Sequence, residues 1–333
     1  MLKNDAFIIS LAYPDTIVRI SDEKLVSYLK YFNIGCANYV RAGHAALVLI
    51  DKSTGCIEYF DFGRYTTPQG YGRVRGKLTD NELDFPLKAN IDNEKIINLN
   101  EILSFLATHP KLTHGDGKLV ASVCAAIDYN RAKNYIMQLQ NKIFVRYGAF
   151  YKNGSNCARF VTDTIINSVN NDSIKKKLIK SKRFTPSTVG NVEIADTQNK
   201  VYEVSDLGNI SEFKSTSKSE NRRCFLDKLN NFEPNFIGNL QPKHVSSAAK
   251  HSQWLEGIGA GAWFELYNLK LEKEFRCKRI SPYGTIDCDS VYEVDSEGFN
   301  INKKYKFLHP SHCLFFTVEQ SGKQFRFNFL RDY

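Results

Sequence analysis

The stretch Gly154-Ser155-Asn156-Cys157-Ala158-Arg159-Phe160-Val161 places a cysteine where a glycine-bearing loop turns into a helix. Ser155 or Asn156 is a suitable N-cap, which predicts Cys157 in the first turn of a helix over 156–168. Unpaired backbone N–H groups and the positive end of the helix dipole stabilise a negatively charged sulfur at such a position. Because the thiolate is the nucleophile in cysteine enzymes, Cys157 is the candidate nucleophile. The alternative is that it is one of eight cysteines that only fill space.

A second segment, far upstream, supplies a candidate base. Residues 43–50 are predicted to form a short buried strand, residues 51–55 a turn, and residues 56–63 a return strand. His44 lies at the entrance of this hairpin, where an imidazole facing a cysteine at a helix start would take the thiol proton. Taken alone, it would be a satisfied histidine at a strand end. Paired with the cysteine, His44 is the predicted general base.

The third catalytic residue depends on the register of the hairpin. If the hairpin closes over a five-residue loop, His44 lies opposite Phe62 and shares its face with Glu58. A shift of one residue places Asp61 opposite His44 instead, because strand side chains alternate with a period of two. Asp61 is closer to the base of the hairpin, so it is the preferred orienting residue and Glu58 is the alternative.

The order of these segments resembles that of a known superfamily. The histidine precedes the cysteine, with Gly-His-Ala-Ala opening a strand and Asn-Cys-Ala-Arg-Phe opening a helix. This is similar to the circularly permuted branch of the NlpC-type papain-like superfamily, which includes lecithin:retinol acyltransferase-like proteins, bacterial cell-wall and lipid hydrolases and eukaryotic deubiquitinating relatives. Phe184-Thr185-Pro186-Ser187 resembles a turn that follows the cysteine helix in several members. The segment 59–65 is similar to an uncharacterised bacterial family of this type, and the whole resemblance covers roughly residues 5–190.

The resemblance implies an α+β fold in which an antiparallel sheet packs on helices. We expect this permuted papain-like catalytic domain over 1–195 and an accessory domain over 196–333. Aromatic and polar residues alternate over 264–333, which predicts an antiparallel β-rich module there. The polar stretch 211–222 is expected to be a linker or an exposed loop near the boundary.

Hydrophobic periodicity predicts several further elements. These are strands over 6–12 and 82–90, and helices over 22–32, 99–107, 118–130 and 246–255. Cys124 would be buried and inert in the third of these helices. The glycines of 257–261 follow the last predicted helix and precede a strand, whereas a dinucleotide-binding loop follows a strand and opens a helix. They are therefore predicted to form a turn, and no cofactor is expected.

Composition and cysteine spacing limit the classes of protein to which the chain can belong. The 333 residues, 42% hydrophobic and 24% charged, suit two compact globular domains. No apolar run approaches the ~20 residues of a membrane-spanning helix, and residues 1–14 are predicted as a core strand rather than a signal peptide. The scattered cysteines lack any Cys-x-x-Cys pair, which argues against a disulfide scaffold and a zinc site. We expect a cytoplasmic protein, or one exported without a recognisable signal peptide.

The net charge of +9 raises the question of an anionic partner. The basic run 175–183 has no accompanying nucleic-acid motif, so a solvated helix face is favoured over a phosphate-binding patch and no nucleic acid is expected. A second basic stretch follows the hairpin and contains Arg64, Arg73, Arg75 and Lys77. If these residues line the cleft, they favour an anionic group on the substrate.

Together these features predict a cysteine hydrolase. Cys157 would attack an amide to form a thioester, with His44 as base and then acid, and with Asp61 or Glu58 orienting the imidazole. The backbone N–H of Cys157 would stabilise the oxyanion. A peptide-type amide, such as a cell-wall peptide or an isopeptide, is the first expectation for the substrate. A lipid acyltransferase or esterase on the same site, and a non-catalytic binding protein on the same scaffold, are the alternatives.

Overall fold

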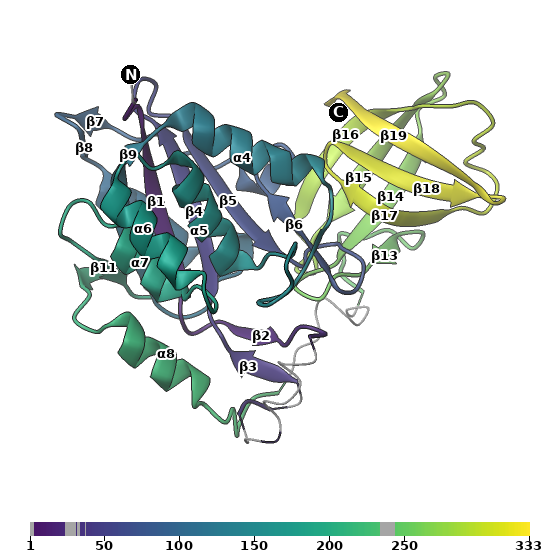
Figure 1. Cartoon of the computed structure of the whole chain (residues 1–333). Helices are drawn as coiled ribbons and strands as arrows, with labels where there is room; N and C mark the ends of the chain where they lie inside the picture. The colour runs from purple at the N-terminus through teal and green to yellow at the C-terminus, as the bar shows by residue number, and fades with distance from the viewer. Residues whose placement is uncertain (1–2, 24–30, 32–33, 37, 234–243) are drawn as a thin grey trace. The chain divides into compact units, whose positions relative to one another are not determined.

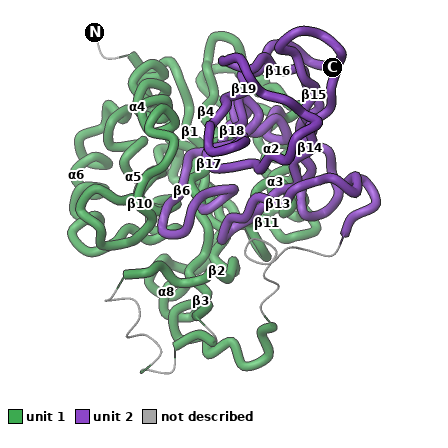
Figure 2. The backbone as a smooth tube through the Cα atoms, turned by 90° about the vertical axis from the view of Figure 1, so that its right-hand side faces the viewer, with its two compact units in different colours: residues 1–63, 85–234 green, residues 64–84, 235–333 purple. Residues whose placement is uncertain are grey.

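The structure is a computed structural model that describes most of the chain (Figure 1). The described residues are 3–23, 31, 34–36, 38–233 and 244–333. They form two compact units, coloured separately in Figure 2: unit 1 contains residues 1–63 and 85–234, and unit 2 contains residues 64–84 and 235–333. The helix predicted over 22–32 lies mostly outside the described residues.

Unit 1 is built on an antiparallel sheet in which neighbouring strands follow the order β5-β4-β1-β9-β11-β12 (Figure 1). These strands are β1 (Ala6–Tyr13), β4 (His44–Asp51), β5 (Ile57–Gly63), β9 (Leu119–Ile127), β11 (Tyr202–Val204) and β12 (Ile210–Glu212). Every residue of β1 is buried, and so is every residue of β4 except the last. Strands covered on both faces are predominantly apolar, which explains the sequences AFIISLAY and HAALVLI.

Helices cover this sheet, as the α+β prediction requires. They are α2 (Leu99–Thr108), α3 (Pro110–Thr113), α4 (Tyr129–Asn141), α5 (Cys157–Ser168), α6 (Asp172–Ser181), α7 (Thr188–Ala195) and α8 (Ser217–Phe225). Helices α4 and α5 pack on β4, and α7 packs on β1 and β9 (Figure 1). Short strands complete the unit: β2 (Ile17–Arg19) pairs with β3 (Tyr39–Arg41), β7 (Ile91–Asp92) pairs with β8 (Lys95–Ile96), and β10 (Val145–Arg146) precedes the loop before α5.

The helix predicted over 118–130 was wrong, because residues 119–127 form β9. The stretch LVASVCAAI is apolar throughout, so its periodicity does not distinguish a buried strand from a buried helix. Its β-branched residues fit the pleated surface between β1 and β11. Cys124 is buried as expected, but it lies on this central strand. The helix α4 begins only after Asp128, whose side chain accepts the N–H of Arg131 as an N-cap.

Three other local predictions were also wrong. Residues 81–83 form the short 3₁₀ helix η2 (Asn81–Leu83) where a strand over 82–90 was expected. The polar stretch 211–222 is not a linker, since it contains the end of β12 and most of α8, which buries only Glu220 and Cys224. The expected helix over 246–255 is replaced by turns and by β13 (Gln253–Leu255), because these residues pair with the next strand of unit 2.

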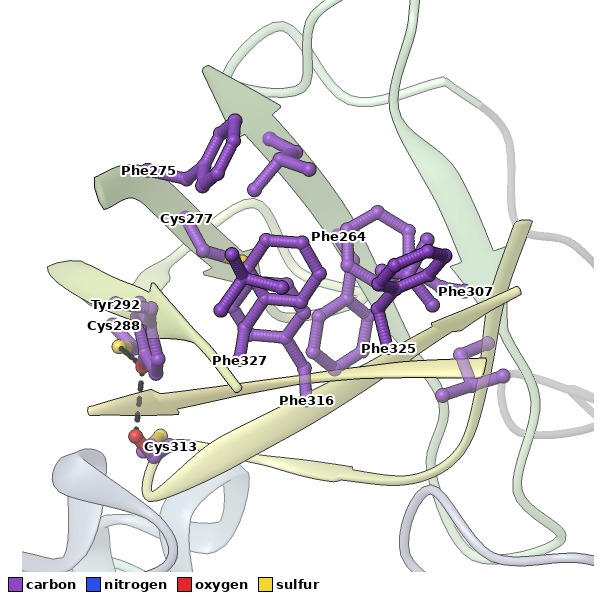
Figure 3. Packing of buried hydrophobic residues seen from close by; sticks show 14 of the residues in the cluster. Phe264, Phe275, Cys277, Cys288, Tyr292, Phe307, Cys313, Phe316, Phe325 and Phe327 are labelled. Atoms are coloured by element: carbon purple, nitrogen blue, oxygen red, sulfur yellow. Dashed lines mark hydrogen bonds between the residues drawn. The ribbon is translucent and has the colours of Figure 1, made fainter. Parts of the chain in front are cut away.

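Unit 2 confirms the β-rich C-terminal module. Its seven-stranded antiparallel sheet has the order β13-β14-β15-β16-β19-β18-β17. The remaining strands are β14 (Ala262–Asn268), β15 (Glu274–Ile280), β16 (Ile286–Val294), β17 (Lys306–His312), β18 (Phe315–Gln320) and β19 (Lys323–Asp332), and β6 (Tyr71–Arg75) also belongs to this unit. Gln253 of β13 hydrogen-bonds the backbone on either side of the start of β17, so the sheet curls toward a barrel. Phenylalanine side chains from facing strands fill its interior (Figure 3).

Candidate active site

Cys157 is the first residue of α5, as its sequence context predicts. The side chain of Asn156 accepts the backbone N–H of Arg159 at 2.8 Å and caps the helix. Because the first N–H groups of a helix have no intrahelical acceptor, the start of α5 offers donors beside the sulfur. The thiol is largely buried, with 9% of the residue exposed.

His44 is the first residue of β4, and Asp61 lies on the adjacent strand β5. Neither of the two registers considered from the sequence is observed, because Ile50 pairs with Ile57 and Asp61 lies opposite Ala46 rather than opposite His44. The turn that sets this register contains Gly55, whose φ of +68° is in the left-handed region and whose N–H donates to the carbonyl of Asp51 at 2.8 Å.

The observed register separates the two candidate carboxylates. Asp61 is directly opposite Ala46, and residues 44 and 46 of a strand share a face, so Asp61 lies on the face of His44. Glu58 is opposite Leu49 and therefore points to the other face. There it pairs with two side chains of α4, the ammonium of Lys133 and the hydroxyl of Tyr129, the latter at 2.6 Å.

The structure thus brings His44, Asp61 and Cys157 together and leaves Glu58 out. Nε2 of His44 is 3.4 Å from Oδ2 of Asp61, an ion-pair contact rather than a well-aligned hydrogen bond. His44 is 5% exposed and Asp61 is fully buried. Burial disfavours the imidazolium, but the Asp61 carboxylate and the Cys157 sulfur outweigh it and raise the pKa of His44 to about 9.

Two tyrosines that the sequence analysis did not single out support this group. The hydroxyl of Tyr59 donates toward Oδ2 of Asp61, at 3.2 Å, and is equally close to the carbonyl oxygen of Thr113. The ring of Tyr13, directly opposite His44 on β1, stacks on the imidazole with centroids 6.3 Å apart. Tyr59 precedes Asp61 by two residues, and side chains two residues apart on a β-strand lie on the same face of the sheet.

A buried glutamate, Glu23, fixes the loop that leads to the cysteine, and no sequence signal identified it. Its two carboxylate oxygens accept the backbone N–H groups of Ala149 and Phe150, each at 2.7 Å. At Gly148 a Cβ atom would meet the Glu23 carboxyl carbon at 2.5 Å, so only glycine allows this approach. Because its partners are backbone groups 126 and 127 positions away, side-chain patterns do not reveal the contact.

The basic stretch after the hairpin has a structural explanation within unit 2. Arg73 pairs with Asp80 through two contacts of 2.6 Å, and both residues are buried. The next two cations each lie near a carboxylate. Arg75 is 3.7 Å from the partly buried Glu82, and Lys77 is 3.7 Å from the exposed Asp84. These three cations therefore have carboxylate partners within unit 2, and Arg64 is also buried, so pairing and burial account for the basic stretch without an anionic substrate.

Two further findings concern the described part of the chain as a whole. No cluster of three or more His, Cys, Asp or Glu side chains converges there in a way that suits a metal ion. Within the same residues, no helix is both long enough and apolar enough to cross a membrane.

Comparison with protein families identifies both parts of the chain. Residues 8–174, half of the chain and the part that contains His44, Asp61 and Cys157, match the family described as type VI secretion system effector TseH-like. The chain belongs to this TseH-like effector family. Residues 252–330 match the DUF6695 C-terminal domain, which corresponds to the β-rich sheet of unit 2.

Among solved structures, the crystal structure of the type VI secretion system effector TseH is similar, with 17% identity and a TM-score of 0.45. The match covers 63% of this chain and 99% of that chain. Comparison with curated proteins gives no match.

The role of Glu23 leads to a testable expectation. In a Glu23→Gln variant the amide nitrogen replaces one acceptor, so one of the buried N–H groups of Ala149 and Phe150 loses its partner at a cost of about 1–3 kcal/mol. Hydrogen–deuterium exchange of peptides spanning 147–156 should become faster. Exposed Glu101, changed to Gln, serves as the matched control and should leave exchange in this loop unaltered. Equal protection in the wild type and the Glu23 variant would show that the carboxylate does not anchor the loop.

Proposed function

We propose that this chain is a cysteine hydrolase that cleaves an amide through a thioester intermediate. The observation that carries the proposal is the position of His44, whose Nε2 lies 3.4 Å from Asp61 and whose pKa is raised by both Asp61 and the Cys157 sulfur, although the three residues come from separate elements. Nucleophilic cysteine catalysis needs this arrangement of a thiol, a base and a group that orients the base. The membership of the TseH-like effector family supports a role as an effector exported by a type VI secretion system.

The raised pKa of His44 determines the protonation state in which the reaction would begin. With a pKa of about 9, the imidazole is mostly protonated at neutral pH. An imidazolium beside the sulfur, together with the N–H groups at the start of α5, stabilises negative charge on the sulfur when Cys157 acts as the nucleophile. The proposed reactive state is a thiolate–imidazolium pair whose positive member is held by Asp61.

The proposed steps follow from this pair. The Cys157 thiolate attacks the amide carbon, and the backbone N–H of Cys157 stabilises the resulting oxyanion. The His44 imidazolium gives its proton to the leaving nitrogen, the C–N bond breaks and an amine departs. A water molecule then attacks the thioester while neutral His44 takes its proton, which releases the carboxylic acid and restores the thiolate–imidazolium pair.

The chemistry of the leaving group favours an amide over an ester as substrate. An amine leaves only after its nitrogen is protonated, and a histidine that keeps its proton up to about pH 9 is well suited to supply that proton. An ester releases an alcohol, and the departure of that alcohol depends less on protonation of its oxygen by an acid. Within the amide class, a peptide or isopeptide of the bacterial cell wall is the substrate we propose, because an exported effector encounters such material outside the producing cell.

Selective alkylation tests the nucleophile. Cys157 should react with iodoacetamide well below pH 8 and faster than the other seven cysteines, and His44→Ala should slow its labelling at least tenfold because the imidazolium is lost. Peptide mapping after brief labelling identifies the modified residue. Glu58→Gln changes the carboxylate on the opposite face and should leave the rate within twofold of the wild type. Slow labelling of all cysteines at similar rates would favour a non-catalytic binding protein on this scaffold.

Hydrolysis as a function of pH tests the proton donor. The rate on cell-wall peptide fragments should be sustained through neutral pH and fall as the pH rises through about 9, because His44 loses the proton that the leaving amine needs. Asp61→Asn removes a group that raises this pKa, so the alkaline limb should move to lower pH and the maximal rate should drop. Fatty-acid esters are assayed in parallel. Turnover of esters without any release of amine from peptides would contradict the amidase proposal and favour the acyltransferase or esterase alternative.

A further inference from the structure

Two thiols that the proposed hydrolysis does not use lie together inside unit 2. Cys288 is on β16, and Cys313 is in the turn between β17 and β18, 25 positions further along the chain. Both are free cysteines, and both are buried, at 5% and 3% exposure. Figure 3 shows them at one end of the phenylalanine-rich interior, on either side of the hydroxyl of Tyr292.

The contacts of these thiols define a built site rather than a chance proximity. The Tyr292 hydroxyl donates to the carbonyl oxygen of Cys313 at 2.7 Å and lies 3.0 Å from Sγ of Cys288. Each thiol also shifts the pKa of the other, which indicates that the two lie close together. Tyr292 is itself almost fully buried against Phe316, so the three groups are held in place by the packing of the sheet.

A buried cation adds the charge that dithiol chemistry needs. Nη1 of Arg279 lies 3.4 Å from Sγ of Cys313, and Arg279 also pairs with the buried carboxylate of Asp80 at 2.9 Å. The neighbouring Cys313 thiol and the charge of Arg279 lower the pKa of Cys288 to about 6. Cys288 is therefore the member of the pair that ionises more readily, and Cys313 is the member that keeps its proton.

We propose that Cys288 and Cys313 are a redox-sensitive dithiol that a small-molecule disulfide, such as oxidised glutathione, converts into an intramolecular disulfide. The Cys288 thiolate attacks one sulfur of the oxidant, the S–S bond of the oxidant breaks and one glutathione thiolate leaves. Cys313 then gives up its proton and attacks Sγ of Cys288, which releases the second glutathione thiolate. The two cysteines are oxidised by two electrons and the oxidant is reduced to two thiols.

The disulfide would connect β16 to the turn after β17 and so constrain a long loop of unit 2. Because both sulfurs are buried, the exchange requires the turn at Cys313 to open and is expected to be slow. The dithiol form suits a reducing compartment and the disulfide an oxidising one, so oxidation would follow export. None of the residues involved belongs to the proposed active site, so failure of hydrolysis does not affect this inference.

Thiol counting on the intact chain tests the proposal. The reduced full-length protein is incubated with oxidised glutathione at neutral pH, quenched with acid, and alkylated with N-ethylmaleimide in denaturant before mass and peptide analysis. We expect two alkylated cysteines fewer, one disulfide mapped to Cys288 and Cys313, and a rise in the Tm of unit 2 of roughly 5–10 °C that dithiothreitol reverses. Because the wild-type chain itself gives this readout, the test does not depend on a variant that folds.

Single cysteine substitutions identify which two residues form the disulfide. Cys288→Ser and Cys313→Ser should each prevent the loss of two thiols, whereas Cys277→Ser, a buried cysteine on neighbouring β15, should leave it unchanged. Three results would overturn the proposal. They are eight alkylated cysteines after prolonged oxidation, a disulfide that joins Cys288 to Cys277 instead, and glutathione adducts at Cys36 or Cys56 while the thiols of Cys288 and Cys313 stay reduced.

Discussion

The ion pair between Asp61 and His44 is the interaction on which the proposed chemistry depends. A fully buried carboxylate loses several kcal/mol of hydration free energy unless a cation or hydrogen-bond donors compensate it. Here the imidazolium of His44 and the hydroxyl of Tyr59 supply that compensation. In the proposed mechanism the same pair holds the imidazole beside the sulfur of Cys157, so one electrostatic contact would both stabilise the interior and prepare the nucleophile.

The sheet makes this contact possible by fixing the register of β4 against both neighbours. His44 is opposite Tyr13 on β1, and Ala46 is opposite Asp61 on β5. A slip of one residue between β4 and β5 would turn every side chain of β5 to the other face. Glu58 would then lie on the same face as His44, without its partners on α4, and Asp61 would lie on the opposite face. The different partners on the two faces of β5 and the turn at Gly55 therefore fix the geometry of the site.

The positions of Cys157 and His44 on their elements were predictable because their signals are local. Cys157 follows a capping residue, and His44 opens an apolar strand after a glycine, so each has a place that short patterns identify. The choice between Asp61 and Glu58 was not predictable, because it depends on one residue of register that the turn decides. Glu23 left no signal, since its partners are backbone groups of a distant loop.

The fold was predictable in its class and less so in its details. The α+β arrangement and the β-rich C-terminal module follow from apolar runs and aromatic alternation. Residues 119–127 were mistaken for a helix because an unbroken apolar segment is compatible with the periodicity of a helix and with that of a strand. Only pairing with the neighbouring strands β1 and β11 makes this segment a strand. Helix α8 was mistaken for a linker because it buries little apolar surface. The pairing of Cys288 with Cys313 is likewise a product of tertiary structure, invisible in their spacing.

Titration of His44 by NMR tests the central claim most directly. With the histidines isotopically labelled and His44 identified by the resonance lost in His44→Gln, the imidazole of the wild-type chain should titrate with a midpoint near 9. The midpoint should move down toward the ordinary value of 6.5 when Asp61 is changed to Asn. A wild-type midpoint at or below 6.5 that does not respond to Asp61 would show that the buried ion pair does not form.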